Sequence, residues 1–337
     1  MKKFLKGLLT FLLVFIAIRI IILVCLPYPW GNPWFSAKIR YMKKENIKPE
    51  MVFMGSSRVY RQIDPSLYDS LARASGKGDL NSFNLGAPAT FPPQTYYLLE
   101  HYLHSGLASG TKYLILEIED ILPLGNRHQE RTSYWIQPKY LWMVLKSTLQ
   151  RRDLKPMGKA KIIGGYLEAS AERIFGLGHF RSEIKEPDYY DPIYVGPNKD
   201  GFLPLDKDYK LQQREGFQER LNKIEPEVIK KRFQNAMTAL PNQKSLDKVH
   251  LDYLKKMIAQ IEQKNIKVFL LVPPRNANSY VLSLAHELAG HNQVLDLSKN
   301  PDYYKLELSA DNGHLNNKGA SIFTKELFEK TAGSLNQ

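Results

Sequence analysis

Five short apolar runs, each followed by turn-forming residues, recur along the chain. They are Met51–Met54, Ser82–Leu85, Tyr113–Ile118, Lys267–Val272 and Gln293–Leu297. Short apolar runs bounded by turn signals suit strands that are covered on both faces of a parallel sheet. Helical patterns at residues 65–74, 94–107, 245–264 and 318–332 lie between or after these runs. The alternation predicts an α/β domain with a parallel five-stranded sheet.

Residues 121–245 interrupt this alternation, because they are rich in Tyr, Pro and charge and show no strong strand pattern. A structureless loop of this length is rare in a folded domain, so we expect a mostly helical insertion or cap. The domain itself would then consist of residues 51–120 and 246–337. Aromatic stretches at 134–136 and 140–145 leave two interpretations open, packing on the core or contact with a membrane or partner. Residues 186–201 are predicted to be irregular loop.

The first 30 residues are predicted to be a membrane anchor. The stretch from Gly7 to Pro27 is almost entirely apolar and long enough for a helix to cross a bilayer. Arg19 interrupts it, and we expect that side chain to reach toward the headgroups. The length of the stretch and the lack of a small-x-small cleavage site argue against a cleaved signal peptide. A linker is expected over residues 31–50.

The net charge of +13 is concentrated in two segments. Residues 1–45 hold eight Lys or Arg against one Glu, and residues 131–185 hold eleven against four acidic residues. Such local excess points to an anionic surface or polymer near both segments. Nucleic acid is disfavoured because the chain carries a predicted anchor.

The predicted topology is a single pass through the cytoplasmic membrane. Lys2, Lys3 and Lys6 favour a cytoplasmic N-terminus, which would place the folded domain outside, although basic residues at 38–44 weaken that asymmetry. The chain has one cysteine, Cys25, inside the predicted span, and a soluble part without thiols fits either compartment.

A Gly-Ser-Ser turn directly follows the first predicted strand. A serine at this point, here Ser57, would expose its hydroxyl at the carboxyl edge of the sheet, beside the free amides of a helix start. Those amides can stabilise an oxyanion. The alternative is an ordinary serine that caps a helix. At the end of the second strand, Asn84 and Gly86 occupy the same edge, and the Gly86 amide is a second candidate oxyanion donor.

Asp311 and His314 precede the last predicted helix. An Asp three residues before a His, across a turn with a glycine, lets the carboxylate hold one imidazole nitrogen while the other faces a nucleophile. These residues are therefore the candidate partners of Ser57 in a catalytic triad.

Together these three segments resemble the sequence blocks of the SGNH (GDSL-like) hydrolase superfamily, in the same order and at strand ends. The resemblance covers the β/α frame on both sides of the insertion. It makes Ser57 the nucleophile, Gly86 the second-block glycine, and Asp311 with His314 the last block. It implies a three-layer α/β/α sandwich and ester chemistry without a cofactor.

Two departures from that pattern stand out. Ser56 replaces the usual Asp before the nucleophile, and the usual Gly-x-Asn-Asp block is missing. The third strand is followed instead by the acidic stretch from Glu117 to Asp120. The oxyanion hole would then consist of the Ser57 and Gly86 amides, or of a group from elsewhere.

The Gly-Ser-Ser block, the predicted anchor and the late Asp-x-x-His are similar to the membrane-anchored cell-envelope O-acyltransferase branch of that superfamily, which includes alginate acetyltransferases and the lipoteichoic acid D-alanylation protein. The resemblance implies acyl transfer through acyl-Ser57 to a polysaccharide or teichoic-acid-like polymer, beside a membrane-bound O-acyltransferase. An esterase with the same triad is an alternative. So is a non-catalytic scaffold that binds the polymer or the acyltransferase partner.

Several other residues are weaker candidates for binding a substrate or a metal. Arg58 would hold a substrate anion or pair with an acidic neighbour, and Asn84 and Arg275 are weak candidates for substrate binding at the same sheet edge. His101 and His104 lie three residues apart on a predicted helix but have no ligand partner at metal-site spacing, so no metal is expected.

Overall fold

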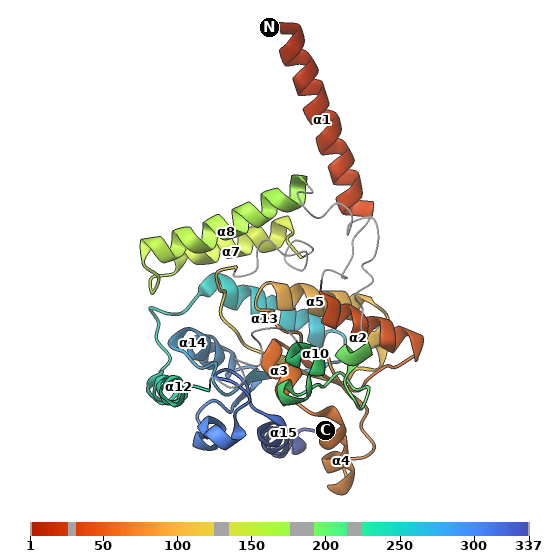
Figure 1. The fold of residues 1–337 in the computed structure, drawn as a ribbon, viewed down its shortest axis with the longest axis vertical. Helices are drawn as coiled ribbons and strands as arrows, with labels where there is room; N and C mark the ends of the chain where they lie inside the picture. The colour runs from red at the N-terminus through yellow and green to blue at the C-terminus, as the bar shows by residue number, and fades with distance from the viewer. Residues whose placement is uncertain (1, 26–31, 125–134, 176–191, 214–223, 336–337) are drawn as a thin grey trace.

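A computed structural model describes residues 2–25, 32–124, 135–175, 192–213 and 224–335 (Figure 1). Its centre is a five-stranded parallel sheet with the order β2-β1-β3-β4-β5. The strands are β1 (Met51–Met54), β2 (Ser82–Asn84), β3 (Tyr113–Glu117), β4 (Lys267–Val272) and β5 (Gln293–Asp296). Each lies within a residue or two of its predicted bounds, so the predicted α/β class with a parallel sheet is confirmed.

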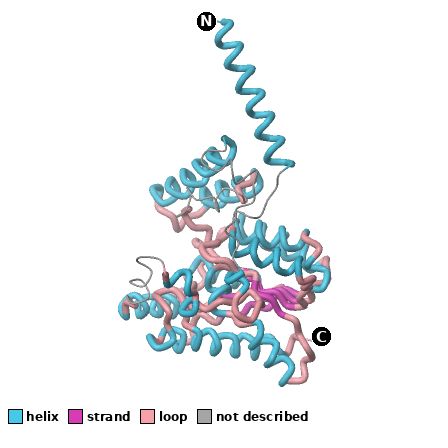
Figure 2. The backbone as a smooth tube through the Cα atoms, turned by 45° about the vertical axis from the view of Figure 1, so that its right-hand side comes forward, coloured by secondary structure: helices cyan, strands magenta, loops and turns pink. Residues whose placement is uncertain are grey.

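Helices cover both faces of the sheet, as Figure 2 shows. Alternate side chains of a strand belong to different apolar clusters: Val52 and Met54 lie in one, and Met51 and Phe53 in the other. The first cluster also takes residues of α2 (Pro33–Lys44), α5 (Gln94–His104), α13 (Lys248–Glu262) and α14 (Ser279–Leu288). The second takes residues of α4 (Pro65–Ala74), α12 (Pro226–Thr238) and α15 (Asn317–Ala332). The result is three layers, with the sheet between two helical layers.

The stretch expected to be a linker is a helix of the core. Asn32 accepts a hydrogen bond from the Phe35 amide and so caps α2, and Pro33 is its first residue. Phe35 and Met42, one apolar face of this helix, are completely buried against the sheet layer. The prediction of a linker was therefore wrong for residues 33–44, because the apolar face of this helix packs into the core, whereas residues 45–50 connect it to β1.

The insertion is helical in its described parts, but it is not one separate cap. Two of its helices, α7 (Pro138–Gln150) and α8 (Pro156–Phe175), pack against each other, and α7 also contacts α13. By contrast, α12 joins the opposite layer of the sandwich. Short elements lie between them: η2 (Pro192–Val195), η3 (Leu205–Lys207) and α10 (Tyr209–Gln212). Trp135 and Ile136 are buried, so this part of the aromatic stretch packs on the core, whereas Tyr134 lies outside the described residues.

The first helix, α1 (Lys2–Cys25), projects away from the sandwich (Figure 1). Its segment Lys2–Ile21 is long and apolar enough to cross a membrane, with a mean hydropathy of 2.3 and 6% of that window buried. Length and apolarity are shared by signal sequences and membrane spans, so these two properties alone do not separate them.

Candidate active site

The turn after β1 is built as the sequence predicted. Ser56 has an extended backbone and is the N-cap of the short helix α3 (Ser57–Gln62), where its Oγ accepts from the Arg58 amide at 3.2 Å. Ser57 is the first helical residue, so its amide has no acceptor within the helix. The Ser57 side chain is partly exposed at the carboxyl edge of the sheet.

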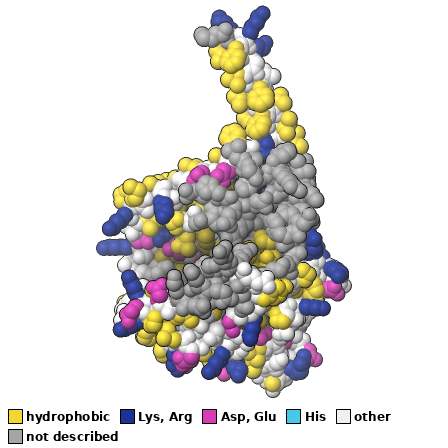
Figure 3. All heavy atoms as spheres, in the orientation of Figure 1, with side chains coloured by type: hydrophobic (Ala, Val, Ile, Leu, Met, Phe, Trp, Pro, Cys, Tyr) yellow, Lys and Arg dark blue, Asp and Glu magenta, His cyan; other side chains and the backbone are white. Residues whose placement is uncertain are grey.

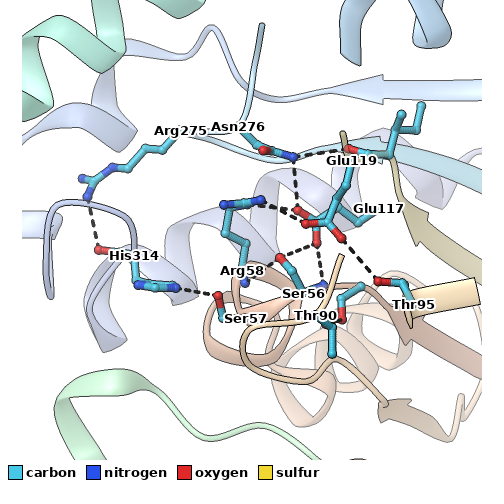
Figure 4. A network of polar contacts seen from close by, with 12 residues as sticks. Ser56, Ser57, Arg58, Thr90, Thr95, Glu117, Glu119, Arg275, Asn276 and His314 are labelled. Atoms are coloured by element: carbon cyan, nitrogen blue, oxygen red, sulfur yellow. Dashed lines mark hydrogen bonds and ion pairs between the residues drawn. The ribbon is translucent and has the colours of Figure 1, made fainter. Parts of the chain in front are cut away.

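Ser57, His314 and Asp311 form a continuous hydrogen-bonded triad (Figure 4 shows the first two). His314 Nε2 lies 2.7 Å from Ser57 Oγ, although 257 residues separate them in the chain. The other ring nitrogen, Nδ1, lies 2.9 and 3.0 Å from the two carboxylate oxygens of Asp311. All three distances are short enough for hydrogen bonding and for proton transfer. The geometry therefore allows His314 to act as a base toward Ser57 while Asp311 holds the ring.

The Asp311–His314 turn fixes the carboxylate as well as the ring. Asp311 Oδ1 accepts from the amides of Gly313 and His314 at 2.6 and 2.7 Å. Burial acts to raise the pKa of Asp311, but the hydrogen bonds from His314 and these two amides outweigh it and hold the pKa well below its ordinary value. Asp311 is thus ionised over the whole physiological range, as a residue that orients and stabilises an imidazolium must be.

Arg275 holds this turn in place. Its guanidinium donates to the carbonyl oxygen of His314 at 3.2 Å (Figure 4) and to that of Asp311 at 2.8 Å. It also donates twice to the carbonyl of Tyr303, and to Ser309 Oγ at 2.6 Å. The residue is 5% exposed and has a φ of +65°, an uncommon conformation for a residue other than glycine. Its donors are directed at the protein, so the expectation that Arg275 binds substrate is not supported.

The side chain of Asn84 and the amide of Gly86 are likewise hydrogen-bonded within the protein. Asn84 is fully buried, and its side-chain amide donates to the carbonyls of Val59 and Ile63, at the end of α3. Its Oδ1 accepts from the Gly86 amide at 2.9 Å. Because that amide already has an acceptor, the structure does not offer it to an oxyanion, and the Ser57 amide alone remains of the expected pair. Asn84 is correspondingly a cap of α3 and has no free group for substrate.

A buried charged cluster, made of Ser56, Arg58, Glu117 and Glu119, lies beside Ser57 (Figure 4). One oxygen of Glu117 accepts from both the amide and the hydroxyl of Ser56 at 2.7 Å. The other accepts from Arg58 Nε at 3.0 Å, and Arg58 Nη2 reaches Glu119 at 3.1 Å. Arg58 therefore pairs with acidic neighbours, one of the two roles expected for it, and this pairing leaves little support for a substrate-binding role.

Glu117 is the residue of the site that sequence reasoning missed. It is the last residue of β3, it is 1% exposed, and Asn276 Nδ2 adds a longer contact of 3.4 Å. The signal was present, since a charged residue inside a run of otherwise apolar strand residues is costly unless it is paired. A Cβ on Gly55 would lie 2.5 Å from Glu117 Oε2, so this carboxylate also explains the glycine before Ser56.

Glu119 completes the charged cluster just beyond β3. Burial, together with the adjacent Glu117, raises its pKa well above the ordinary value, and Arg58 only partly opposes this. Two buried carboxyls thus share one guanidinium, and the second oxygen of Glu119 accepts from the Thr95 hydroxyl at 3.4 Å.

Three other histidines, His101, His104 and His250, have structural neighbours. His101 packs edge-on against Phe35, and His104 Nδ1 contacts the Glu100 carbonyl. His250 is fully buried between the hydroxyls of Tyr96 and Tyr280. Within the described ranges, no group of three or more His, Cys, Asp or Glu side chains is arranged to hold a metal ion.

Comparison with known proteins adds no relative. No protein-family model, no curated protein and no solved structure matches this chain.

Proposed function

We propose that this protein is a serine-dependent acyl-transfer enzyme that works through an acyl-Ser57 intermediate. The single observation that carries the proposal is the 2.7 Å contact of His314 Nε2 with Ser57 Oγ, backed by the contact of Nδ1 with an ionised Asp311. A serine that only capped a helix would need neither partner. The likeness of the motifs to SGNH hydrolases supports the same chemistry.

The reaction would proceed in two balanced halves. His314 takes the proton of Ser57 as its oxygen attacks the acyl carbon, and the Ser57 amide donates to the developing oxyanion. His314 then returns the proton to the leaving group, which departs and leaves the acyl group on Ser57. In the second half, His314 removes the proton of an acceptor hydroxyl that attacks the ester, and Ser57 regains a proton. Asp311 stabilises the imidazolium in both halves.

The proposed location is the outer face of a cytoplasmic membrane, with α1 as the anchor. The basic N-terminal residues and the apolar segment Lys2–Ile21 support this orientation. The proposed acceptor is a hydroxyl of a polysaccharide or teichoic-acid-like polymer of the envelope, and a membrane-bound O-acyltransferase is the proposed partner. The likeness to the envelope branch supports acceptor and partner alike.

Covalent labelling tests the nucleophile. A fluorophosphonate should label the full-length protein in detergent, and mass spectrometry should find the adduct on the peptide with Ser57. Ser57→Ala and His314→Ala should abolish labelling, whereas Ser70→Ala, at an exposed serine on α4, should leave it unchanged. Equal labelling of wild type and Ser57→Ala would refute the proposal.

Acceptor competition separates transfer from hydrolysis. With a chromogenic acetyl ester as donor, a transferase should release the chromophore faster when a glycan acceptor is added, and the acetyl group should appear on the glycan. An esterase would instead send the acetyl group to water at every acceptor concentration. A folded protein inert to both donor and fluorophosphonate would point to the scaffold.

A further inference from the structure

The α8 helix carries an apolar stripe on its exposed side. Its six residues recur at helical spacing: Met157, Ala160, Gly164, Leu167, Ala171 and Ile174. All are exposed, and Met157, Leu167 and Ile174 are 80%, 47% and 48% exposed. The opposite side of the helix holds its buried residues, among them Ile162 and Tyr166. A helix that is apolar on both sides needs a second apolar environment on its exposed side.

The end of this stripe touches α1. Arg19 donates through Nε to the Ile174 carbonyl at 2.7 Å and through Nη2 to the Arg173 carbonyl at 2.5 Å. The rings of Phe15 and Phe175 stack with their centroids 6.2 Å apart. The Arg19 charge, an obstacle to membrane insertion in isolation, is thus only 3% exposed and sits on the negative end of the α8 dipole.

These contacts fix where the end of α8 lies along the length of α1. The apolar sequence of α1 continues beyond Arg19 with Ile20 and Ile21, which are 55% and 59% exposed. Ile20 also lines a groove together with Ile174 and Leu141. If those residues of α1 are embedded in lipid, the end of α8 lies at the same depth. Figure 1 shows α8 running crosswise to α1, the direction of a helix that lies in the plane of a membrane surface.

Exposed basic residues and an exposed tryptophan on α7 and α8 are residue types that favour a membrane surface. Figure 3 shows hydrophobic side chains along the side of the α7–α8 pair that faces α1, with Lys and Arg nearby and acidic side chains near the α1 end, where Glu168 of α8 is exposed. Exposed cations of these two helices and their connection include Lys146, Arg152, Lys155 and Lys161. Trp142 is 65% exposed on α7, and tryptophan favours the boundary between lipid and water. Arg151, expected in this basic group, is instead buried in ion pairs with Asp120 and Asp153.

We propose that the α8 stripe is a second membrane contact, which lies in the headgroup region of a bilayer that contains anionic lipid. In this arrangement α1 crosses the bilayer, α8 rests on it, and the lysines around the stripe meet lipid phosphates. The contact is independent of the acyl-transfer chemistry and depends only on α1 being in the membrane.

Site-directed fluorescence in nanodiscs tests the contact with the full chain. Cys25→Ser removes the only thiol, and single cysteines then replace Leu167 on the stripe, Leu9 on α1, or Leu240 beyond α12. Each is labelled with an environment-sensitive dye, and quenching by spin-labelled lipid is measured. We expect Leu9→Cys and Leu167→Cys to be quenched several-fold more than Leu240→Cys, which is a control of similar exposure.

Each result has a distinct meaning. Quenching at Leu9→Cys without quenching at Leu167→Cys would overturn the proposal and leave α1 as the only contact. A dye at Leu167→Cys that is shielded from water but not quenched by lipid would mean that protein covers the stripe, which also overturns it. If Leu9→Cys is not quenched, the membrane location fails as a whole, whereas fluorophosphonate labelling of Ser57 would still report on the chemistry.

A charge test separates anionic lipid from lipid in general. The pair Lys155→Glu and Lys161→Glu should reduce quenching at Leu167→Cys several-fold in nanodiscs with phosphatidylglycerol, and by much less in purely zwitterionic nanodiscs. The control pair, Lys255→Glu and Lys256→Glu, lies on an exposed face of α13 and should change neither value. Equal effects of both pairs would refute the role of the stripe lysines.

Discussion

Arg275→Met should uncouple the catalytic turn from the body of the sandwich. The side chain is similar in length but has no donor, so the carbonyls of residues 303, 311 and 314 and Ser309 Oγ each lose the guanidinium as a donor, and the His314 carbonyl keeps the Ala310 amide at 3.0 Å. A buried acceptor left unpaired costs about 1–3 kcal/mol, and such costs are not additive. A hydrogen bond to a charged group contributes about 1.5–3 kcal/mol, so for the non-additive loss of this set we expect a destabilisation of about 3–5 kcal/mol.

The effect on reactivity follows from the same contacts. Two of the lost hydrogen bonds end on the carbonyls of Asp311 and His314, so the turn is free to move relative to Ser57. A displacement of roughly 1 Å can lower a rate by about 10²-fold. We therefore expect fluorophosphonate labelling of the folded Arg275→Met protein to be slower by about that factor. Arg275→Lys should lie between it and wild type, because one ammonium cannot reach all the acceptors.

Arg151→Met is the matched control. Arg151 is also a buried arginine, with 5% of its side chain exposed, but its partners Asp120 and Asp153 are not residues of the triad. Denaturant unfolding should give both variants comparable losses of stability, and only Arg275→Met should lose labelling. If Arg275→Met labels within about twofold of wild type under conditions where it is folded, the inferred role of Arg275 is wrong.

The remaining predictions concern three carboxyl groups, those of Glu117, Glu119 and Asp311. Glu117→Gln should cost about 2–4 kcal/mol in denaturant unfolding, because it weakens contacts to both Ser56 and Arg58, whereas Glu119→Gln should cost less than about 1 kcal/mol. The raised pKa of Glu119 favours the folded state below the ordinary pKa, and this contribution is lost as pH rises through the raised value. In Glu119→Gln the free energy of unfolding should therefore fall less as pH rises, and a pH profile equal to that of wild type would contradict the raised pKa of Glu119. Asp311→Asn should lower ester turnover by roughly 10³–10⁴-fold. Because the folded pKa of Asp311 is lowered, its contribution to stability is present above the ordinary pKa near 4 and disappears as pH falls through the lower value. The stability gap between wild type and Asp311→Asn should accordingly narrow below about pH 4 in urea titrations, and a constant gap would count against the lowered pKa.

The sheet could be predicted from the sequence because each strand is a compact apolar run, and a parallel sheet places the ends of such strands at one edge. From that rule, Ser57 and His314 could be predicted to lie close together, although 257 residues separate them in the chain. The role of α2 was missed because its apolar face is interspersed with lysines and arginine, which resemble a solvated linker. Even Lys38 in this helix is buried, with its ammonium 2.7 Å from the Gly86 carbonyl.

The errors at the site have a different cause. Asn84, Gly86 and Arg275 lie near the expected edge, but sequence position does not reveal which groups are already paired. Each proved to be satisfied by backbone or side chains of the protein. Burial and pairing depend on side-chain contacts between segments far apart in the chain, and no local pattern encodes them.

The carboxylate of Glu117 also makes sense of the unusual residue before the nucleophile. Ser56 donates two hydrogen bonds to it inside the protein, where an aspartate side chain would bring a second negative charge against the first. Gly55 has no room for any side chain beside the same oxygen. Positions 55, 56 and 117 are therefore interdependent: Ser56→Asp should be tolerated only together with loss of the charge at 117. The serine at position 56 and the glutamate at position 117 are thus a matched pair, and changing either one alone should cost stability.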